Sequence, residues 1–259
     1  MTSATPAPRY NRAVAIAAIS DFYHFLTHLP RLSESDIIDA PAAGWPELTD
    51  AFLAPLAKSQ AVNDLIRHLP YISDGEERNS QIAPEGTSVV RYNGPDVRWS
   101  IEKGVIDGTL TPVGAGRIPP HVAVLTDAGR YGSWLLLDTE EGTSLPQEGK
   151  LTGVIQGTIT DYIQFERPER STPSADSPDH WRAYRTLPIA EFFEEWKAKY
   201  LLAEWVVLPE EVDDAVRYRF DAETDEVREI YREHGWPDAF RQDECRRALI
   251  EWCDRKREA

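Results

Sequence analysis

The stretch SWLLLDT, residues 133–139, decides the fold class because it is apolar almost throughout. A short run of this kind is typical of a central strand that is buried on both faces of a sheet. Other runs around it are also short, rich in Val, Ile, Trp and Tyr, and bounded by Gly, Pro and Asp. They are SVVRY (88–92), DVRWSIE (96–102), HVAVLT (121–126) and TITDYIQFE (158–166). We therefore predict a central, mostly antiparallel sheet of about five strands within residues 88–166.

Helical patterns flank this sheet on both sides. Apolar residues recur at helical intervals from Asn11 to Leu29, and PIAEFFEEWKAKYLLAEW (188–205) carries one wide apolar stripe. Further helices are expected at about 47–68, 221–234 and 238–256. The order of helices, then strands, then helices predicts an α+β fold with the C-terminal helices packed on the sheet.

The domain organisation follows from the same patterns. We predict a single domain over residues 11–256, helical over 11–72 and again over 187–256. Residues 1–10 are polar and proline-bearing, which predicts a disordered tail. The segment 143–157 between two strands is expected to protrude as a loop that contributes little to the fold.

The charge balance restricts the class of partner. The 259 residues include 44 Asp and Glu against 28 Lys and Arg, which gives a net charge of −16. Nonspecific binding to a phosphate backbone depends on Lys and Arg that displace counterions, so this composition argues against it. The composition favours a cationic partner or a cationic substrate.

The two cysteines and the absence of long apolar runs bear on localisation. Cys245 and Cys253 are eight residues apart in one predicted helix, so their α-carbons would lie about 12 Å apart, too far for a disulfide. The chain has no signal-type segment and no run of eighteen apolar residues. We therefore expect a reduced, cytoplasmic protein without membrane contact.

Metal and phosphate sites find little support in the sequence. His24 and His28 are four residues apart, but no Glu follows His24 as in HExxH and no third ligand is evident. The run GAGR (114–117) lacks the lysine and the following helix of a phosphate-binding loop. We expect no metal and no cofactor.

Three segments interleave arginines with aromatic residues: DAGRYGSWLLLDT (127–139), HWRAYRT (180–186) and YREHGWPDAFRQDECRR (231–247). Such arginines can stack on bases, clamp a carboxylate or phosphate, or pair with nearby acids, and the sequence leaves these alternatives open. The candidate substrate-binding residues are Arg130, Tyr131, Trp134, Asp138, Trp181, Arg182, Arg185, Tyr231 and Trp236.

The stretch TDEVREIYREHGWPD (224–238) sets Asp225 and Glu229 four residues apart. On a helix the two carboxylates lie one turn apart on the same face, where like charges repel by a few tenths of a kcal/mol. Either the pair belongs to a solvated helix face, or it binds a guanidinium or serves as acid and base.

These segments together resemble a group of ascomycete fungal proteins identified with the arginine-containing cyclodipeptide synthases. The resemblance rests on GRYGSWLLLDTEEGT, TITDYI, WRAYRTLPIAEFFEEWKAKY and YREHGWPDAFRQDECRRAL and spans roughly residues 20–253. It implies an aminoacyltransferase that takes arginine from arginyl-tRNA, joins it to a second aminoacyl group from another aminoacyl-tRNA and closes a diketopiperazine.

The acidic motif of that family, DDxxE, has its nearest match in DEVRE, residues 225–229. The resemblance therefore implies catalytic roles for Asp225, Glu226 and Glu229, with Glu226 standing where the family has its second Asp. No catalytic serine of the bacterial type maps onto this chain.

A second resemblance gives a different function. The run VAVLTDAGRYGSWLLLDTEEG (122–142), the strand TITDYIQF and the helix PIAEFFEEW are similar in pattern to the SUKH superfamily, whose members are mostly binding and immunity modules. It implies a module without catalysis that recruits a basic protein partner through its acidic surface. The two functions, and the oligomeric state, stay open at the level of the sequence.

Overall fold

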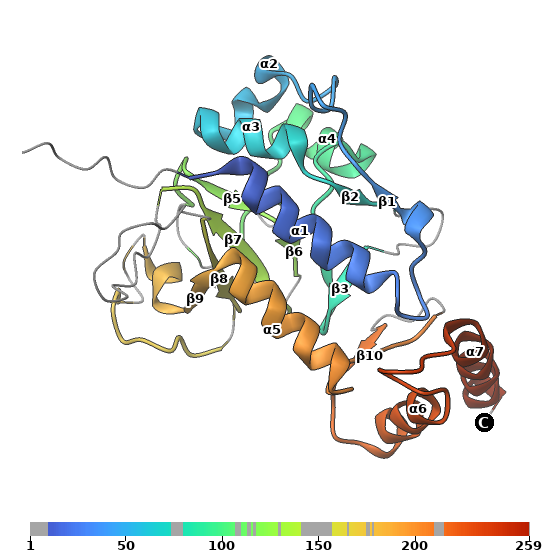
Figure 1. Cartoon of the computed structure of the whole chain (residues 1–259). Helices are drawn as coiled ribbons and strands as arrows, with labels where there is room; N and C mark the ends of the chain where they lie inside the picture. Colours follow the sequence, from blue (N-terminus) through green and yellow to red (C-terminus); the bar gives the residue numbers. More distant parts are fainter. Residues whose placement is uncertain are drawn as a thin grey trace, which may run out of the picture.

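The computed structural model describes residues 10–73, 80–106, 110–112, 115, 118–128, 131–140, 157–164, 166–174, 177, 179–209 and 215–258. Within these ranges the chain forms seven α-helices and eleven short strands, and every strand pair is antiparallel (Figure 1). The α+β class is therefore confirmed. The predicted tail, except Tyr10, and the segment 143–157, except Gly157, lie outside the described residues, as does Arg130.

The main sheet has four strands in the order β5 (Val122–Val124), β7 (Trp134–Asp138), β8 (Thr158–Tyr162) and β9 (Arg185–Pro188). All five residues of β7 are buried, which confirms it as a strand buried on both faces. Its register sets Leu135 opposite Asp161, and Asp161 opposite Arg185, so these three share one face. Asp138 lies opposite Val122 and Thr158 on the other face.

The prediction of one five-stranded sheet was wrong. Strand β4 (Thr87–Val89) pairs instead with β3 (Gln81–Ala83) and β6 (Thr126–Asp127) in a separate three-stranded sheet. The predicted strand 121–126 is divided between the two sheets at Leu125: its N–H donates to Leu135, and its carbonyl accepts from Val90. Two-stranded sheets join β1 (Ile37–Ile38) to β2 (Tyr71–Ile72) and β10 (Val206–Val207) to β11 (Val216–Arg217).

The predicted strand DVRWSIE is a helix, α4 (Pro95–Lys103). Gly94 caps it, Pro95 occupies the first turn, and Gly104 adopts a left-handed conformation with φ 68° directly after its last residue. Proline at the start and glycine just past the end are strong helix boundaries, and here they outweigh the strand preference of Val, Trp and Ile. Val97 and Ile101, four residues apart, turn toward the core.

The N-terminal region contains one confirmed helix and one that is interrupted. Helix α1 (Arg12–Leu26) forms as predicted. The expected helix 47–68 is instead two helices, α2 (Asp50–Leu53) and α3 (Gln60–His68). Between them Pro55 lies in a 3-10 turn, and Ala57 takes a left-handed φ of 50°, which an α-helix does not accommodate.

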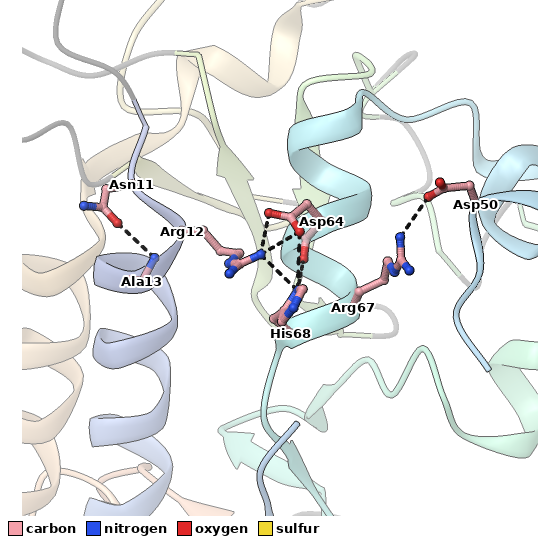
Figure 2. Close-up of polar contacts among 7 residues, drawn as sticks. All are labelled: Asn11, Arg12, Ala13, Asp50, Asp64, Arg67 and His68. Atoms are coloured by element: carbon pink, nitrogen blue, oxygen red, sulfur yellow. Dashed lines mark hydrogen bonds and ion pairs between the residues drawn. The ribbon is translucent and has the colours of Figure 1, made fainter. Parts of the chain in front are cut away.

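Figure 2 shows how polar side chains hold these helices together. Arg12 of α1 donates to both carboxylate oxygens of Asp64 on α3, at 2.6 and 2.7 Å. Asn11 caps the start of α1 by accepting from the Ala13 N–H at 3.0 Å. Arg67 of α3 pairs with Asp50 of α2 at 3.1 Å. These contacts fix α1 and α2 relative to α3.

The C-terminal helices occupy two places. Helix α5 (Ile189–Leu201) lies beside α1 and packs on β8 and β9 (Figure 1). Helices α6 (Ala222–Glu233) and α7 (Gln242–Glu258) pack against each other, and α6 also contacts β10. Cys245 and Cys253 of α7 are both buried and do not bridge each other, as predicted.

No helix in the described ranges combines the length and the apolar character needed to cross a bilayer.

Candidate functional site

The acidic motif lies on α6, whose N-terminal cap is the Asp221 carboxylate accepting from the Thr224 N–H at 2.8 Å. Asp225, Glu226 and Glu229 are all exposed. Each one already has a cationic partner. Asp225 pairs with Arg228 at 2.8 Å and Glu229 with Arg232 at 2.9 Å, both three residues ahead on the same helix. These ion pairs offset the repulsion that the sequence predicts between the two carboxylates.

Glu226 turns toward α7 instead. Its carboxylate accepts from the Trp252 Nε1–H at 2.7 Å and from the Lys256 ammonium at 3.3 Å. The bond from Trp252, then the one from Lys256, lowers the pKa of Glu226 below its usual range. An ionised Glu226 therefore links α6 to α7.

Arg228 links several segments of this region, and its side chain is only 5% exposed. Its Nε donates to the Ala203 carbonyl at 2.9 Å, and a terminal nitrogen donates to the carbonyls of Glu204 and Tyr218, both at 3.1 Å. One guanidinium thus joins the turn after α5, the segment after β11, and α6.

A second cluster lies at the end of β7 around Asp138, whose side chain is 1% exposed. Arg182 donates to its Oδ2 at 2.9 Å and lies 3.2 Å from His121 Nε2. Because a guanidinium only donates hydrogen bonds, Nε2 accepts, and the imidazole proton is on Nδ1. That nitrogen faces Glu140 at 3.5 Å.

The backbone brings this cluster together from distant parts of the sequence. Trp181 and Arg182 come from a 3-10 turn, η3 (His180–Ala183), and the Arg182 guanidinium lies 4.4 Å from the centre of the fully buried Trp181 ring. Of the predicted substrate-binding residues, Asp138, Trp181 and Arg182 therefore meet. Sequence reasoning missed His121 and Glu140, because only the pairing of Val122 with Asp138 places them beside the cluster.

The other predicted substrate-binding residues lie elsewhere. Trp134 is buried in β7 opposite Tyr162, Tyr131 is exposed in the preceding turn, and Arg185 pairs with Glu195 of α5. Tyr231 exchanges hydrogen bonds with the backbone N–H and C=O of Val207 at 3.0 and 2.9 Å, and Trp236 Nε1 donates to Tyr200 at 2.9 Å. Tyr231 and Trp236 thus connect α6 and the segment after it to β10 and α5.

The acidic motif and the Asp138 cluster lie at opposite ends of α5. The helix begins directly after Pro188, which lies across Thr158 from Asp138, and ends near Ala203, which Arg228 binds. A helix of 13 residues is about 20 Å long. These two polar clusters are therefore separate, as the positions of β9 and α6 in Figure 1 also indicate.

A third polar group lies on the opposite face of the main sheet. Asp161 accepts a hydrogen bond from the Ser133 side chain, but its Oδ1 is enclosed and has no hydrogen-bond partner among the described residues. Burial raises the pKa of Asp161 to about 6, against the opposing effects of Ser133 and of the Arg185 charge.

The described residues contain no group of three or more His, Cys, Asp or Glu placed to share a metal ion. Comparison with protein-family models, curated proteins and solved structures finds no match to this chain.

Removing Arg182 leaves the buried Asp138 carboxylate without its closest cationic partner. We expect Arg182→Met to lower the free energy of unfolding by about 3 kcal/mol in urea titrations at neutral pH. Arg232→Met is the matched control, since its ion pair with Glu229 is exposed on both sides, and it should cost less than about 1 kcal/mol. Equal losses in the two variants would show that the Asp138 pair does not stabilise the fold.

Asp161 should make stability depend on pH. Its pKa is about 6 in the folded protein and about 3.9 unfolded, so the native state binds the extra proton between these values. The contribution of Asp161 is therefore most favourable below about pH 4, falls as the pH rises to about 6, and is then constant.

We expect the Asp161→Asn variant to become more stable than the wild type as the pH rises from about 4 to about 6. Above about pH 6 the difference in the free energy of unfolding should be at most about 3 kcal/mol. Urea unfolding of both proteins between about pH 4 and pH 8 measures the difference. Asp39→Asn, at an exposed position, controls for the lost charge. A stability difference that is the same at every pH would contradict this prediction.

Proposed function

We propose that the protein is a binding module without catalysis that recruits a basic protein partner through an acidic surface on its C-terminal helices. The observation that carries the proposal is the exposure of every Asp and Glu in residues 221–258. These are twelve carboxylates, against seven exposed Arg and Lys in the same range, because Arg228 is buried. The C-terminal helices thus contribute to the strong negative charge of the whole chain.

The pairing of the α6 acids supports a surface role. A general acid or base must be positioned toward the atom whose proton it transfers. Asp225, Glu226 and Glu229 instead point to three different partners: Arg228, the Trp252 and Lys256 pair, and Arg232. Charges arranged in this way act together as a field that attracts and orients a cationic partner, and no single one is essential.

The order of the elements adds support. Strands β7 and β8 form a hairpin, β9 joins its edge, and α5 then packs on the same sheet. This is the order of strand pair and closing helix on which the resemblance to the SUKH binding modules rests. A shared arrangement alone does not fix function, so the acidic surface is the main support for the proposal.

Binding to basic proteins can be tested by reversing charge at two places. We expect the wild type to retain basic proteins from a fungal extract at low salt and to release them at high salt, because screening weakens surface electrostatics. The variant Glu233→Lys/Asp238→Lys/Glu251→Lys should lose this retention. Each of these side chains is exposed.

The control Asp39→Lys/Glu102→Lys/Glu169→Lys changes the net charge equally at exposed positions outside the C-terminal helices, and it should retain most binding. Failure of the wild type to retain any basic protein at low salt would remove the proposed function. Equal loss in both variants would show that only the net charge matters.

The second candidate function is arginine-containing cyclodipeptide synthesis, and the guanidinium contacts of α6 favour it. Asp225 and Glu229 each hold an arginine side chain at hydrogen-bond distance. An arginyl substrate would have to replace one of these arginines. Arg228 is buried and fixed by three carbonyls, whereas Arg232 is 59% exposed, so Glu229 is the carboxylate that can exchange its partner.

This second function predicts different behaviour for the two acids. Under it, a host with ordinary tRNA pools that expresses the protein accumulates arginine-bearing diketopiperazines, and Glu229→Gln abolishes the product at unchanged melting temperature. Asp225→Asn should lower the melting temperature, because it removes the carboxylate that pairs with buried Arg228. Mass spectrometry of extracts and thermal melting measure both effects, and full product from both variants would exclude the motif from catalysis.

A further inference from the structure

Three large apolar side chains are exposed where α5 ends and where α6 is about to begin. Leu201 and Leu202 end α5 with 43% and 70% of their surface exposed, and Phe220, two residues before α6, is 93% exposed. A single exposed leucine is ordinary on a protein surface. A phenylalanine almost fully in water beside further apolar side chains is typical of a contact surface.

Buried Arg228 ties together the two backbone segments that carry these side chains. Its guanidinium binds the carbonyl of Ala203, the residue after Leu202, and that of Tyr218, two residues before Phe220. The guanidinium carbon also lies 5.2 Å from the centre of the Phe220 ring, within the range of a cation–π contact. The exposed Phe220 ring thus contacts the buried Arg228 guanidinium, whose position is fixed by its hydrogen bonds. We call Leu201, Leu202 and Phe220 the apolar patch.

Carboxylates surround the apolar patch. Glu204, Asp221 and Asp225 are all exposed and lie next to its members in sequence or contact Arg228. The hydrogen bond from the Thr224 backbone N–H lowers the pKa of Asp221, so this carboxylate is ionised at neutral pH. Of the nearby cations, exposed Arg219 pairs with Glu85 at 3.0 Å, buried Arg228 pairs with Asp225 at 2.8 Å, and half-buried Arg217 acts on Asp221. Glu204 and Asp221 are the carboxylates beside the patch that form no ion pair within the described residues, and they supply its negative charge.

We infer that the apolar patch is the docking site for a basic amphipathic helix of a protein partner. This inference rests on the proposed function and names the part of the acidic surface that selects the partner. Apolar residues at helical spacing would cover Leu202 and Phe220, while flanking Lys and Arg face Glu204, Asp221 and Asp225. Apolar anchors surrounded by charge are the usual arrangement of an interface.

The charge of the patch surroundings decides against two other occupants. A second copy of this chain would bring like-charged carboxylates together, which disfavours self-association. An anionic membrane surface would repel the same carboxylates. A cationic helix is the occupant whose charge complements both the patch surroundings and the net charge of −16.

The test uses a fluorescent peptide of about eighteen residues, with leucines at helical spacing on one face and lysines on the other. A scrambled peptide of the same composition keeps the charge but has no apolar face. We expect the wild type to bind the amphipathic peptide at least about tenfold more tightly than the scrambled one in anisotropy titrations. Phe220→Ser and Leu202→Ser should each remove most of this difference.

Trp99→Ser is the matched control, because Trp99 is 55% exposed on α4, which lies far from α6 in Figure 1. It should leave the peptide affinity unchanged. Both patch variants are at highly exposed positions, so their melting temperatures should equal that of the wild type. Leu202→Ser serves by itself if Phe220→Ser does not fold.

The outcomes separate this inference from the proposed function. Equal, salt-dependent binding of both peptides would leave the electrostatic function standing and overturn the docking site. Unchanged peptide affinity in both patch variants would overturn it as well. Phe220-dependent dimers in sedimentation experiments, or binding to anionic vesicles that Phe220→Ser abolishes, would assign the patch to one of the excluded occupants.

Discussion

The complete burial of β7 is the constraint on which the rest of the structure depends. Four of its residues are apolar and need only other side chains to pack against. The fifth, Asp138, places an ionisable group in the same buried environment. An ionised carboxylate in the interior costs free energy unless it has a charged, hydrogen-bonding partner. Arg182 supplies this partner from η3, and the stacking of its guanidinium on Trp181 holds that turn against the sheet. The charge of one residue thus fixes the path of the chain before β9.

Arg182 and Arg228 have different roles. Arg182 neutralises a carboxylate in the interior, whereas Arg228 binds three main-chain carbonyls and a carboxylate that is 67% exposed. Arg228 therefore joins α5, β11 and α6 without neutralising any buried charge. Its charge offsets only the exposed carboxylate of Asp225. The same residue stabilises the C-terminal helices and shapes their surface charge.

Local patterns in the sequence predicted those elements whose stability is local. SWLLLDT, the apolar stripes of α1 and α5, and the acidic helix α6 all form where periodicity places them. DVRWSIE was assigned by strand propensity, although Gly94, Pro95 and Gly104 mark the ends of a helix. Those boundary residues were visible in the sequence, and they decide the element because β-propensity depends strongly on context.

In the candidate site too, local sequence patterns predict some contacts and not others. The ion pairs Asp225–Arg228 and Glu229–Arg232 follow from a spacing of three residues on one helix, so the sequence of α6 contained the signal. His121, Asp138 and Arg182 meet only through the register of β5 on β7 and the return of η3 over the sheet. No local pattern encodes that register. Sequence reasoning therefore selected Asp138 and Arg182 for their residue type and could not place His121 beside them.

The contrast between fixed and exchangeable charges explains how an acidic surface can become selective. Glu229 and Arg232 are both more than half exposed, so a cation from a partner can replace Arg232 with a contact of the same kind and little change in free energy. Such exchange accelerates encounter but discriminates weakly between basic proteins. Selectivity must then come from contacts that only some partners can make. Phe220, next to the acidic helix, is the most exposed residue that can make such contacts, and the buried guanidinium of Arg228 contacts its ring.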